Sequence, residues 1–245
     1  MRDIDDLKKI AILIDAENAQ MHKVKFVLEE ISTQGHIITK RAYGDWSQEP
    51  LKNWKTTLNE LAIHPVQQFA YTTGKNSTDA ALLIDAMDLL YTQKYDAFVL
   101  VSSDSDFTKL ATRLRESQMY VFGVGEQRTP IAFRNACDDF ILTENLGISA
   151  TVSKNTRKKE TEVDSDLKEI IMLLEKAHEK YQDETGWVNV SSAGTYIKRV
   201  KPDFDVRTYG EVKLPDIIKG LDHIFEMTKY KGKGTVNIIA FRPKN

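Results

Sequence analysis

The sequence contains a single cysteine, Cys137, and this scarcity excludes two kinds of architecture. No disulfide can form within the chain, and no cluster of thiolates can bind zinc. The five histidines do not have the spacing of metal ligands either. A chain that relies on neither disulfides nor thiolates suits a reducing compartment, so we predict a cytoplasmic location.

Long apolar runs are also missing. The longest ones are far too short to cross a bilayer, and the opening residues MRDIDDLKK lack the features of a signal peptide. Gly74-Lys75 lacks the remaining glycines of a P-loop, and Gly123-Val124-Gly125 is not a dinucleotide-binding fingerprint. Nothing indicates a serine or cysteine catalytic triad. We therefore expect no membrane partner and none of these common nucleotide or acyl-transfer sites.

What the sequence does contain is an uneven distribution of charge. Residues 1–150 carry 16 Lys and Arg against 21 Asp and Glu, a net charge of −5. Residues 167–245 carry 14 against 11, a net charge of +3, and the polar stretch between them is neutral. The contrast predicts two domains with different tasks, joined by a linker. The predicted bounds are 1–148 for the first domain, 149–166 for the linker and 167–245 for the second domain.

Short apolar strands alternate with amphipathic helices in the first domain. This alternation predicts an α/β fold, with a parallel sheet covered by helices on both faces. The predicted strands are 10–14, 37–43, 66–71, 97–101 and 120–124, and the predicted helices are 24–31, 54–61, 79–91 and 107–114.

The second domain has a different pattern. Three helices precede two β-like runs, which predicts a small winged helix. The predicted helices are 167–177, a segment from Ser191 to just before Pro202, and 214–223, and the predicted strands are 225–230 and 236–241.

Acidic residues gather where predicted strands of the first domain end. Asp15 follows the first strand, Asp104 and Asp106 follow the fourth, and Asp79 opens the helix 79–91. In an open parallel sheet, ligands bind at the carboxyl ends of the strands. Each of these residues taken alone is equally well explained as a helix cap. Four acids at three junctions are harder to explain as caps, because clustered carboxylates repel one another unless a cation is present. The pattern predicts a site for Mg²⁺ or Mn²⁺.

Asp79 begins a helix whose residues four, seven and eleven positions later are apolar, so we expect it at the inward-facing start of a buried stripe. Other polar residues near the four acids are weaker candidates for the site. Asp85 lies off that stripe. Asn18 can position a water or phosphate, or cap a helix, and Lys75 can contact phosphate or lie exposed in a loop.

Taken in order, these motifs resemble a known family. IDAEN, KNSTD, Asp85 six residues after Asp79, and SSDSDF resemble the NYN domain, a branch of the PIN-like ribonucleases, over about residues 8–145. The resemblance implies a PIN-like parallel sheet whose acids bind Mg²⁺ or Mn²⁺ for phosphodiester cleavage. By position, it implies Asp15, Asp79, Asp104 and Asp106 as catalytic metal ligands, with Asn18 and Asp85 as accessory catalytic residues.

A second resemblance covers about residues 166–243. GWVNVSSAGTYIKRVKPDFDVRTYGEVKLPDII, followed by a helix and IIAFRP, resembles the LOTUS domain, also called OST-HTH. LOTUS domains are winged helices that bind RNA, with a reported liking for G-rich RNA, or bind protein partners, and the pair of NYN and LOTUS domains recurs in bacterial proteins. The residues that we expect to contact RNA are Lys75, Lys198, Arg199, Lys201, Arg207, Tyr209, Lys213, Lys229, Lys231 and Lys233.

Two functions from different classes follow from these patterns. The first is a metal-dependent ribonuclease, in which the LOTUS-like domain recruits RNA, G-rich or single-stranded, and the NYN-like domain cuts it. The second is a non-catalytic RNA-binding adaptor that retains the PIN-like fold. A phosphohydrolase that uses the same acids on a small molecule is disfavoured by the appended RNA-type domain. A protein partner at the LOTUS-like domain and a homo-oligomer are both compatible with the sequence.

Overall fold

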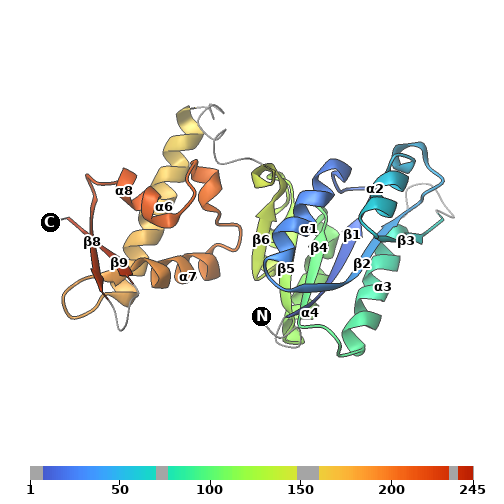
Figure 1. The fold of residues 1–245 in the computed structure, drawn as a ribbon, viewed down its shortest axis with the longest axis horizontal. Helices are drawn as coiled ribbons and strands as arrows, with labels where there is room; N and C mark the ends of the chain where they lie inside the picture. The colour runs from blue at the N-terminus through green and yellow to red at the C-terminus, as the bar shows by residue number, and fades with distance from the viewer. Residues whose placement is uncertain (1–7, 70–76, 148–159, 232–236, 245) are drawn as a thin grey trace. The chain divides into compact units, whose positions relative to one another are not determined.

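A computed structural model describes residues 8–69, 77–147, 160–231 and 237–244 of the chain. For residues 160–166 it describes the backbone alone. The chain divides into two compact units, Met1–Gly147 and Ile148–Asn245, and each has its own hydrophobic core (Figure 1).

Six parallel strands form the sheet of the first unit, in the order β3-β2-β1-β4-β5-β6. The order reverses between β1 and β4, and doubly wound sheets bind ligands at such a reversal. The predicted parallel α/β fold is thus confirmed. The strands are β1 (Lys9–Asp15), β2 (His36–Gly44), β3 (His64–Gln67), β4 (Ala97–Val101), β5 (Tyr120–Gly125) and β6 (Asp139–Leu142).

Two strands differ from their prediction. β3 begins two residues earlier than predicted and ends at Gln67, while residues 70–71 lie outside the described part of the chain. β3 is an edge strand with mostly exposed side chains, so apolar patterning carries little signal there, and Pro65 is tolerated at such an edge. β6 was not predicted, because only three apolar residues follow its opening Asp139.

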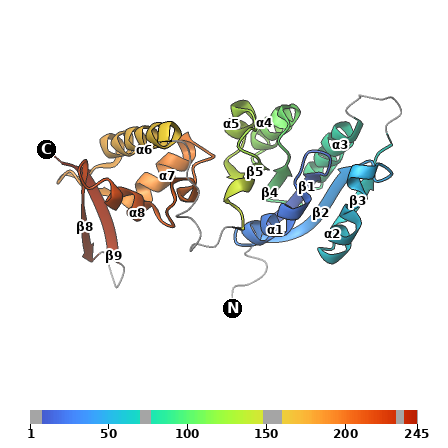
Figure 2. The same ribbon diagram turned by 90° about the horizontal axis from the view of Figure 1, so that it is seen from above.

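Helices cover both faces of this sheet (Figure 2). Ile10, Ile12 and Ile14 of β1 pack in one core with α1 and α2, whereas Ala11 and Leu13 pack in the other with α3, α4 and α5. This alternation places β1 between two apolar layers and explains why it is a continuous apolar run. The helices are α1 (Val24–Ser32), α2 (Trp54–Glu60), α3 (Ser77–Tyr91), α4 (Thr108–Glu116) and α5 (Ile131–Ala136), of which only α5 was not predicted.

The second unit packs three helices against a three-stranded antiparallel sheet of order β7-β9-β8. This matches the small helical domain with a terminal hairpin that the sequence predicted. Its elements are α6 (Glu160–Tyr181), β7 (Val188–Asn189), α7 (Val190–Val200), α8 (Leu214–Gly220), β8 (Phe225–Lys231) and β9 (Asn237–Pro243).

The C-terminal end of the predicted linker is helical, and the domain bounds themselves stay a prediction. Residues 160–166 belong to helix α6, and residues 149–159 lie outside the described part of the chain. Apolar periodicity begins only at Leu167, so the pattern does not reveal the first two turns of the helix. Helix α8 ends three residues before its predicted end. Across the described ranges, the helices are all too short or too polar to cross a membrane.

Candidate metal centre

Asp15 lies at the carboxyl end of β1 and is almost completely buried, with an exposed fraction of 1%. Its Oδ1 accepts hydrogen bonds from the backbone N–H groups of Glu17 at 3.2 Å and Asn18 at 3.3 Å. Its Oδ2 accepts from Asn18 Nδ2 at 2.8 Å and from Ser102 Oγ at 2.7 Å. Burial raises the pKa of Asp15, and these hydrogen bonds act in the opposite direction. Asp15 therefore connects the end of β1 to the residue that follows β4.

The SSDSD segment continues this network. Ser102 Oγ accepts the backbone N–H of Asp104 at 3.1 Å, and Asp104 Oδ1 accepts the backbone N–H of Asp106 at 3.0 Å. Asp104 is thus the N-cap of the 3₁₀ turn η4 (Ser105–Phe107), which leads into α4. The cap engages Oδ1 and fixes the direction of the carboxylate.

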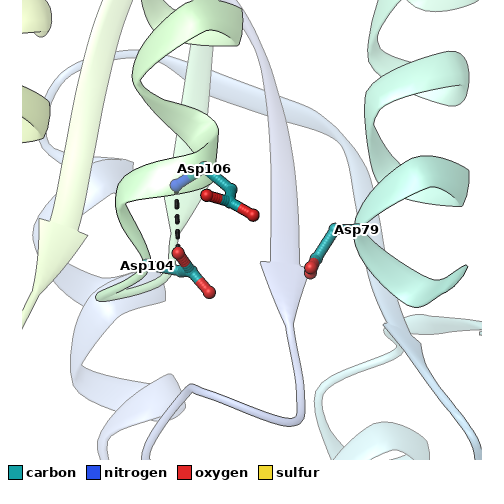
Figure 3. Close-up of side chains that lie close together, drawn as sticks. All are labelled: Asp79, Asp104 and Asp106. Carbon is teal, nitrogen blue, oxygen red and sulfur yellow. Dashed lines mark hydrogen bonds between the residues drawn. The ribbon is translucent and has the colours of Figure 1, made fainter. Parts of the chain in front are cut away.

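Three of the four acids predicted as metal ligands come together in space. One carboxylate oxygen from each of Asp79, Asp104 and Asp106 lies within 4.8 Å of the other two. Asp79 extends from α3 toward Asp106 in the η4 turn and Asp104 at its N-cap (Figure 3). Asp79 and Asp104 are partly buried, and Asp106 is exposed. Asp15 is not a member of this acidic trio.

Electrostatic repulsion is evident at Asp79. Burial, together with the negative charges of Asp15, Asp104, Glu17 and Asp106, raises the pKa of its carboxyl group to about 6. A raised pKa means that the site disfavours another negative charge, and a bound cation would relieve the same repulsion.

The buried stripe of α3 is offset by one residue from the predicted stripe at its N-terminal end only, because Ala86 and Leu90 are buried as predicted. Thr78, Leu82, Ala86, Leu89 and Leu90 are buried, so the offset affects the first two turns, where Asp79 and Leu83 lie at the margin of the stripe and are only partly buried. An ionisable side chain is costly to bury, so the neighbouring threonine takes the inward position and Asp79 reaches the acidic trio.

Asp85 is bound to a different part of the sheet. Arg41 Nη1 and Tyr43 Oη, both from β2, donate hydrogen bonds to its two carboxylate oxygens. Six residues of helix separate Asp85 from Asp79, about 9 Å along the axis. These contacts fasten α3 to β2, which is a role that the sequence did not predict. Lys75 lies outside the described part of the chain.

Two acidic residues near the site were not predicted. Glu17 Oε1 accepts hydrogen bonds from Thr78 Oγ1 at 3.0 Å and from the backbone N–H of Asp45 at 3.3 Å. Asp45 is buried, and hydrogen bonds from Ser47, Gln48 and Gln67 hold its pKa well below the usual range. Asp45 directly follows β2, so the rule that drew attention to Asp15 would have found it.

In the second unit, some residues predicted to bind RNA are engaged within the domain. Lys201 Nζ lies 2.8 Å from both carboxylate oxygens of Glu169. The Arg207 guanidinium binds the Asp205 carboxylate, with its Nη2 at 2.7 Å from Oδ2. Tyr209 packs against Phe204 with ring centroids 5.8 Å apart. Lys201, Arg207 and Tyr209 therefore have evident structural roles.

The other predicted RNA contacts have more accessible side chains. Arg199, Lys213, Lys229 and Lys231 are exposed, and Lys198 is partly buried. Lys233 lies outside the described part of the chain. The accessible cations come from α7, from the residue before α8 and from β8.

Profiles of two known families match the chain, one in each unit. A family profile for the NYN domain matches residues 9–149, more than half of the chain. The chain belongs to the NYN domain family. A profile for the OST-HTH/LOTUS domain matches residues 161–237. A domain of the PIN-like nuclease superfamily is therefore followed by a domain of an RNA-binding type, as the sequence predicted.

Two solved structures are similar to parts of this NYN protein. A crystal structure of a protein of unknown function from Vibrio parahaemolyticus is 19% identical, covers 57% of this chain and 94% of its own, and has a TM-score of 0.46. A solution NMR structure of an uncharacterised protein from Nitrosomonas europaea is 32% identical, covers 30% of this chain and 70% of its own, and has a TM-score of 0.27. Among curated proteins no match was found.

Proposed function

We propose that this protein is a metal-dependent ribonuclease, in which the NYN domain hydrolyses RNA phosphodiester bonds and the LOTUS domain recruits the RNA. The observation that carries the proposal is the convergence of Asp79, Asp104 and Asp106 beside the point where the strand order reverses. Membership of the PIN-like nuclease superfamily supports the reaction class.

The acidic trio fits a hard divalent ion. Oxygen ligands lie about 2.0–2.1 Å from Mg²⁺, so two ligands of one ion are about 3–4 Å apart. The carboxylate oxygens of the trio all lie within 4.8 Å of one another, and all three donors are oxygens. Asp79, Asp104 and Asp106 would hold Mg²⁺ or Mn²⁺, which when bound polarises a phosphoryl oxygen and lowers the pKa of its water.

Surrounding residues of the chain orient the trio. The oxygens of Asp15 accept four hydrogen bonds, so we assign Asp15 to holding Asn18 and Ser102, and through Ser102 the backbone of Asp104. Asp106 is the exposed member of the trio, whereas Asp79 and Asp104 are partly buried, so incoming RNA would meet Asp106 first.

The LOTUS domain would supply most of the attraction for RNA. Its sequence from residue 167 carries a net charge of +3, whereas residues 1–150 carry −5. Exposed Arg199, Lys213, Lys229 and Lys231 are suited to phosphate contacts, which give salt-dependent affinity.

The proposal is tested by incubating labelled single-stranded RNA with the full chain in Mn²⁺, Mg²⁺ or EDTA. We expect cleavage with either ion and none with EDTA. Loss of cleavage in the Asp104→Asn variant, purified in the same way, would exclude a contaminating nuclease as the source of the activity. Binding of RNA without cleavage under all conditions would instead favour the non-catalytic adaptor.

A further inference from the structure

Glu17 contacts the start of a helix and the end of another strand through a single carboxylate oxygen. It follows β1 by two residues, and its Oε1 accepts the hydroxyl of Thr78 at 3.0 Å and the backbone N–H of Asp45 at 3.3 Å. Thr78 is in the first turn of α3, and Asp45 is the residue after β2. One side chain thereby joins three segments that are distant in the sequence.

The contacts continue beyond Asp45 to the edge of the sheet. Gln67, the last residue of β3, donates from Nε2 to Asp45 Oδ1 at 2.9 Å and accepts the backbone N–H of Trp46 at 3.1 Å. The loop that follows β2 is thus fixed on both sides, and Glu17 binds a rigid support rather than an isolated N–H group.

The first turn of α3 determines where Asp79 lies. Thr78 is buried, with an exposed fraction of 5%, and it directly precedes Asp79 in the helix. A displacement of this turn would carry the Asp79 carboxylate away from Asp104 and Asp106. The negative charge of Glu17 also contributes to raising the pKa of Asp79, which agrees with the closeness of the two side chains.

We propose that Glu17 is a positioning residue, whose hydrogen bonds to Thr78 and Asp45 hold the first turn of α3 so that Asp79 completes the acidic trio. The consequence for metal binding rests on the proposed function, whereas the effect on α3 does not. Glu17 acts here as a hydrogen-bond acceptor, and its negative charge is not required.

If Glu17 acts as a hydrogen-bond acceptor, the substitutions Glu17→Gln and Glu17→Ala should have different effects. Glu17→Gln keeps an acceptor oxygen at the end of a side chain of the same length, while Glu17→Ala removes it. A direct metal ligand would behave differently, because a neutral amide is a much poorer ligand for Mg²⁺ or Mn²⁺ than a carboxylate. Thr78→Val removes the donor from the other side of the bond with little change in volume, and Thr78→Ser retains it.

The first experiment measures hydrogen exchange of the backbone amides in residues 77–83 of the full chain, without metal. We expect faster exchange in Glu17→Ala and Thr78→Val, and exchange like that of the unmodified protein in Glu17→Gln and Thr78→Ser. Glu60→Ala, at an exposed acid on α2, is the matched control for loss of one negative charge. Unchanged exchange in both Glu17→Ala and Thr78→Val would overturn the proposal.

The second experiment measures the Mn²⁺ concentration that gives half-maximal RNA cleavage. We expect it to rise about tenfold in Glu17→Ala, the size of effect typical of residues that orient metal ligands, and to be restored by Glu17→Gln. A Glu17→Gln variant as impaired as Glu17→Ala would show that the charge is required and would overturn the proposal. If the unmodified protein cleaves no RNA, the proposed function fails, while the exchange experiment still decides the role of Glu17.

Discussion

Asp104 caps the η4 turn and also carries a negative charge, and one substitution can separate these two roles. Asparagine at this position retains an oxygen that can accept the Asp106 N–H, but it carries no charge. We expect Asp104→Asn to lower divalent-dependent RNA cleavage by about 100-fold or more, as removal of a metal ligand exceeds the effect of its supporting residues. Melting in EDTA should occur at the same or a slightly higher temperature, because repulsion in the trio is relieved.

Two results would count against this assignment of Asp104. Undiminished cleavage by the purified variant would show that the residue does not bind the ion. A large fall in the metal-free melting temperature would show that its main contribution is to the structure of the η4 turn.

The raised pKa of Asp79 makes the stability of the metal-free protein depend on pH. Its folded pKa is about 6 and its ordinary value is 3.8, so between these values the folded state binds more protons than the unfolded state. The contribution of Asp79 therefore destabilises the fold as pH rises from about 4 through 6. Solvent screening of this partly exposed group reduces the effect to about 1 kcal/mol.

This pH effect is measured by urea unfolding in EDTA at pH 4.5 and 7.5, for the unmodified protein and Asp79→Asn. We expect Asp79→Asn to be the more stable protein at pH 7.5 and the difference to shrink at pH 4.5. Mn²⁺ affinity of the unmodified protein should increase as pH rises through about 6, since the ligand must be ionised. A stability difference that does not change with pH would contradict the assignment.

Helix α3 is held to the sheet by the contacts of Arg41 and Tyr43 with Asp85. Removing the carboxylate leaves a partly buried guanidinium and a buried phenol without this acceptor. We expect Asp85→Ala to lower the free energy of unfolding by about 1–3 kcal/mol. Asp88→Ala, at an exposed position of the same helix, is the matched control and should change it by less than about 0.5 kcal/mol.

Comparison of Asp85→Ala with Asp88→Ala decides whether Asp85 stabilises the fold or takes part in the reaction. If Asp85→Ala keeps full stability but loses cleavage, then its role is at the reacting phosphate, as the family resemblance implied, and the anchoring role is wrong.

The hairpin formed by β8 and β9 presents lysines to solvent. Lys229 and Lys231 are two residues apart in β8, so they project from the same face, and both are exposed. We expect replacement of Lys229, Lys231 and Lys233 by alanine to weaken binding to many RNA sequences. The slope of log affinity against log salt should flatten by about 0.7 for each phosphate that the variant no longer neutralises.

Filter binding at several salt concentrations measures both the affinity and the slope. Lys176→Ala, at an exposed position of α6, is a control for loss of one positive charge and is compared with Lys229→Ala alone. Equal reductions of affinity in these two variants would mean that RNA senses only the net charge of the domain and does not bind the hairpin.

The second unit has a core of its own, which predicts that it folds independently. Ile170, Leu174, Ile197, Ile218 and Phe241 are among its fully buried residues. A fragment spanning residues 160–245 has 86 residues, a size at which one core suffices without disulfides or metal. We expect a cooperative thermal transition by circular dichroism, and RNA affinity close to that of the full chain.

Residues 1–147 should then retain metal-dependent cleavage with much weaker RNA binding. An unfolded 160–245 fragment would show that the two units depend on each other. A folded fragment without RNA affinity at low salt would make the LOTUS domain a docking site for protein and would remove the recruitment step.

The sequence by itself determined the parallel fold, the positions of most strands and helices, and the convergence of acids at one edge of the sheet. Each of these depends on a local pattern. Apolar periodicity identifies an element, and the ends of parallel strands share one edge whatever their order. Asp79, Asp104 and Asp106 were found in this way because each one begins a helical segment or follows a strand.

Only the tertiary structure decided which atoms meet at that edge. Asp15 is tied to Ser102 outside the trio, and Asp85 is paired with Arg41, although the family resemblance groups both with the trio. The bond between Glu17 and Thr78 joins residues 61 positions apart. Such contacts depend on strand order and on how α3 packs against β2. No local pattern encodes either, because a side chain two residues from a strand end can turn toward any of several neighbouring segments.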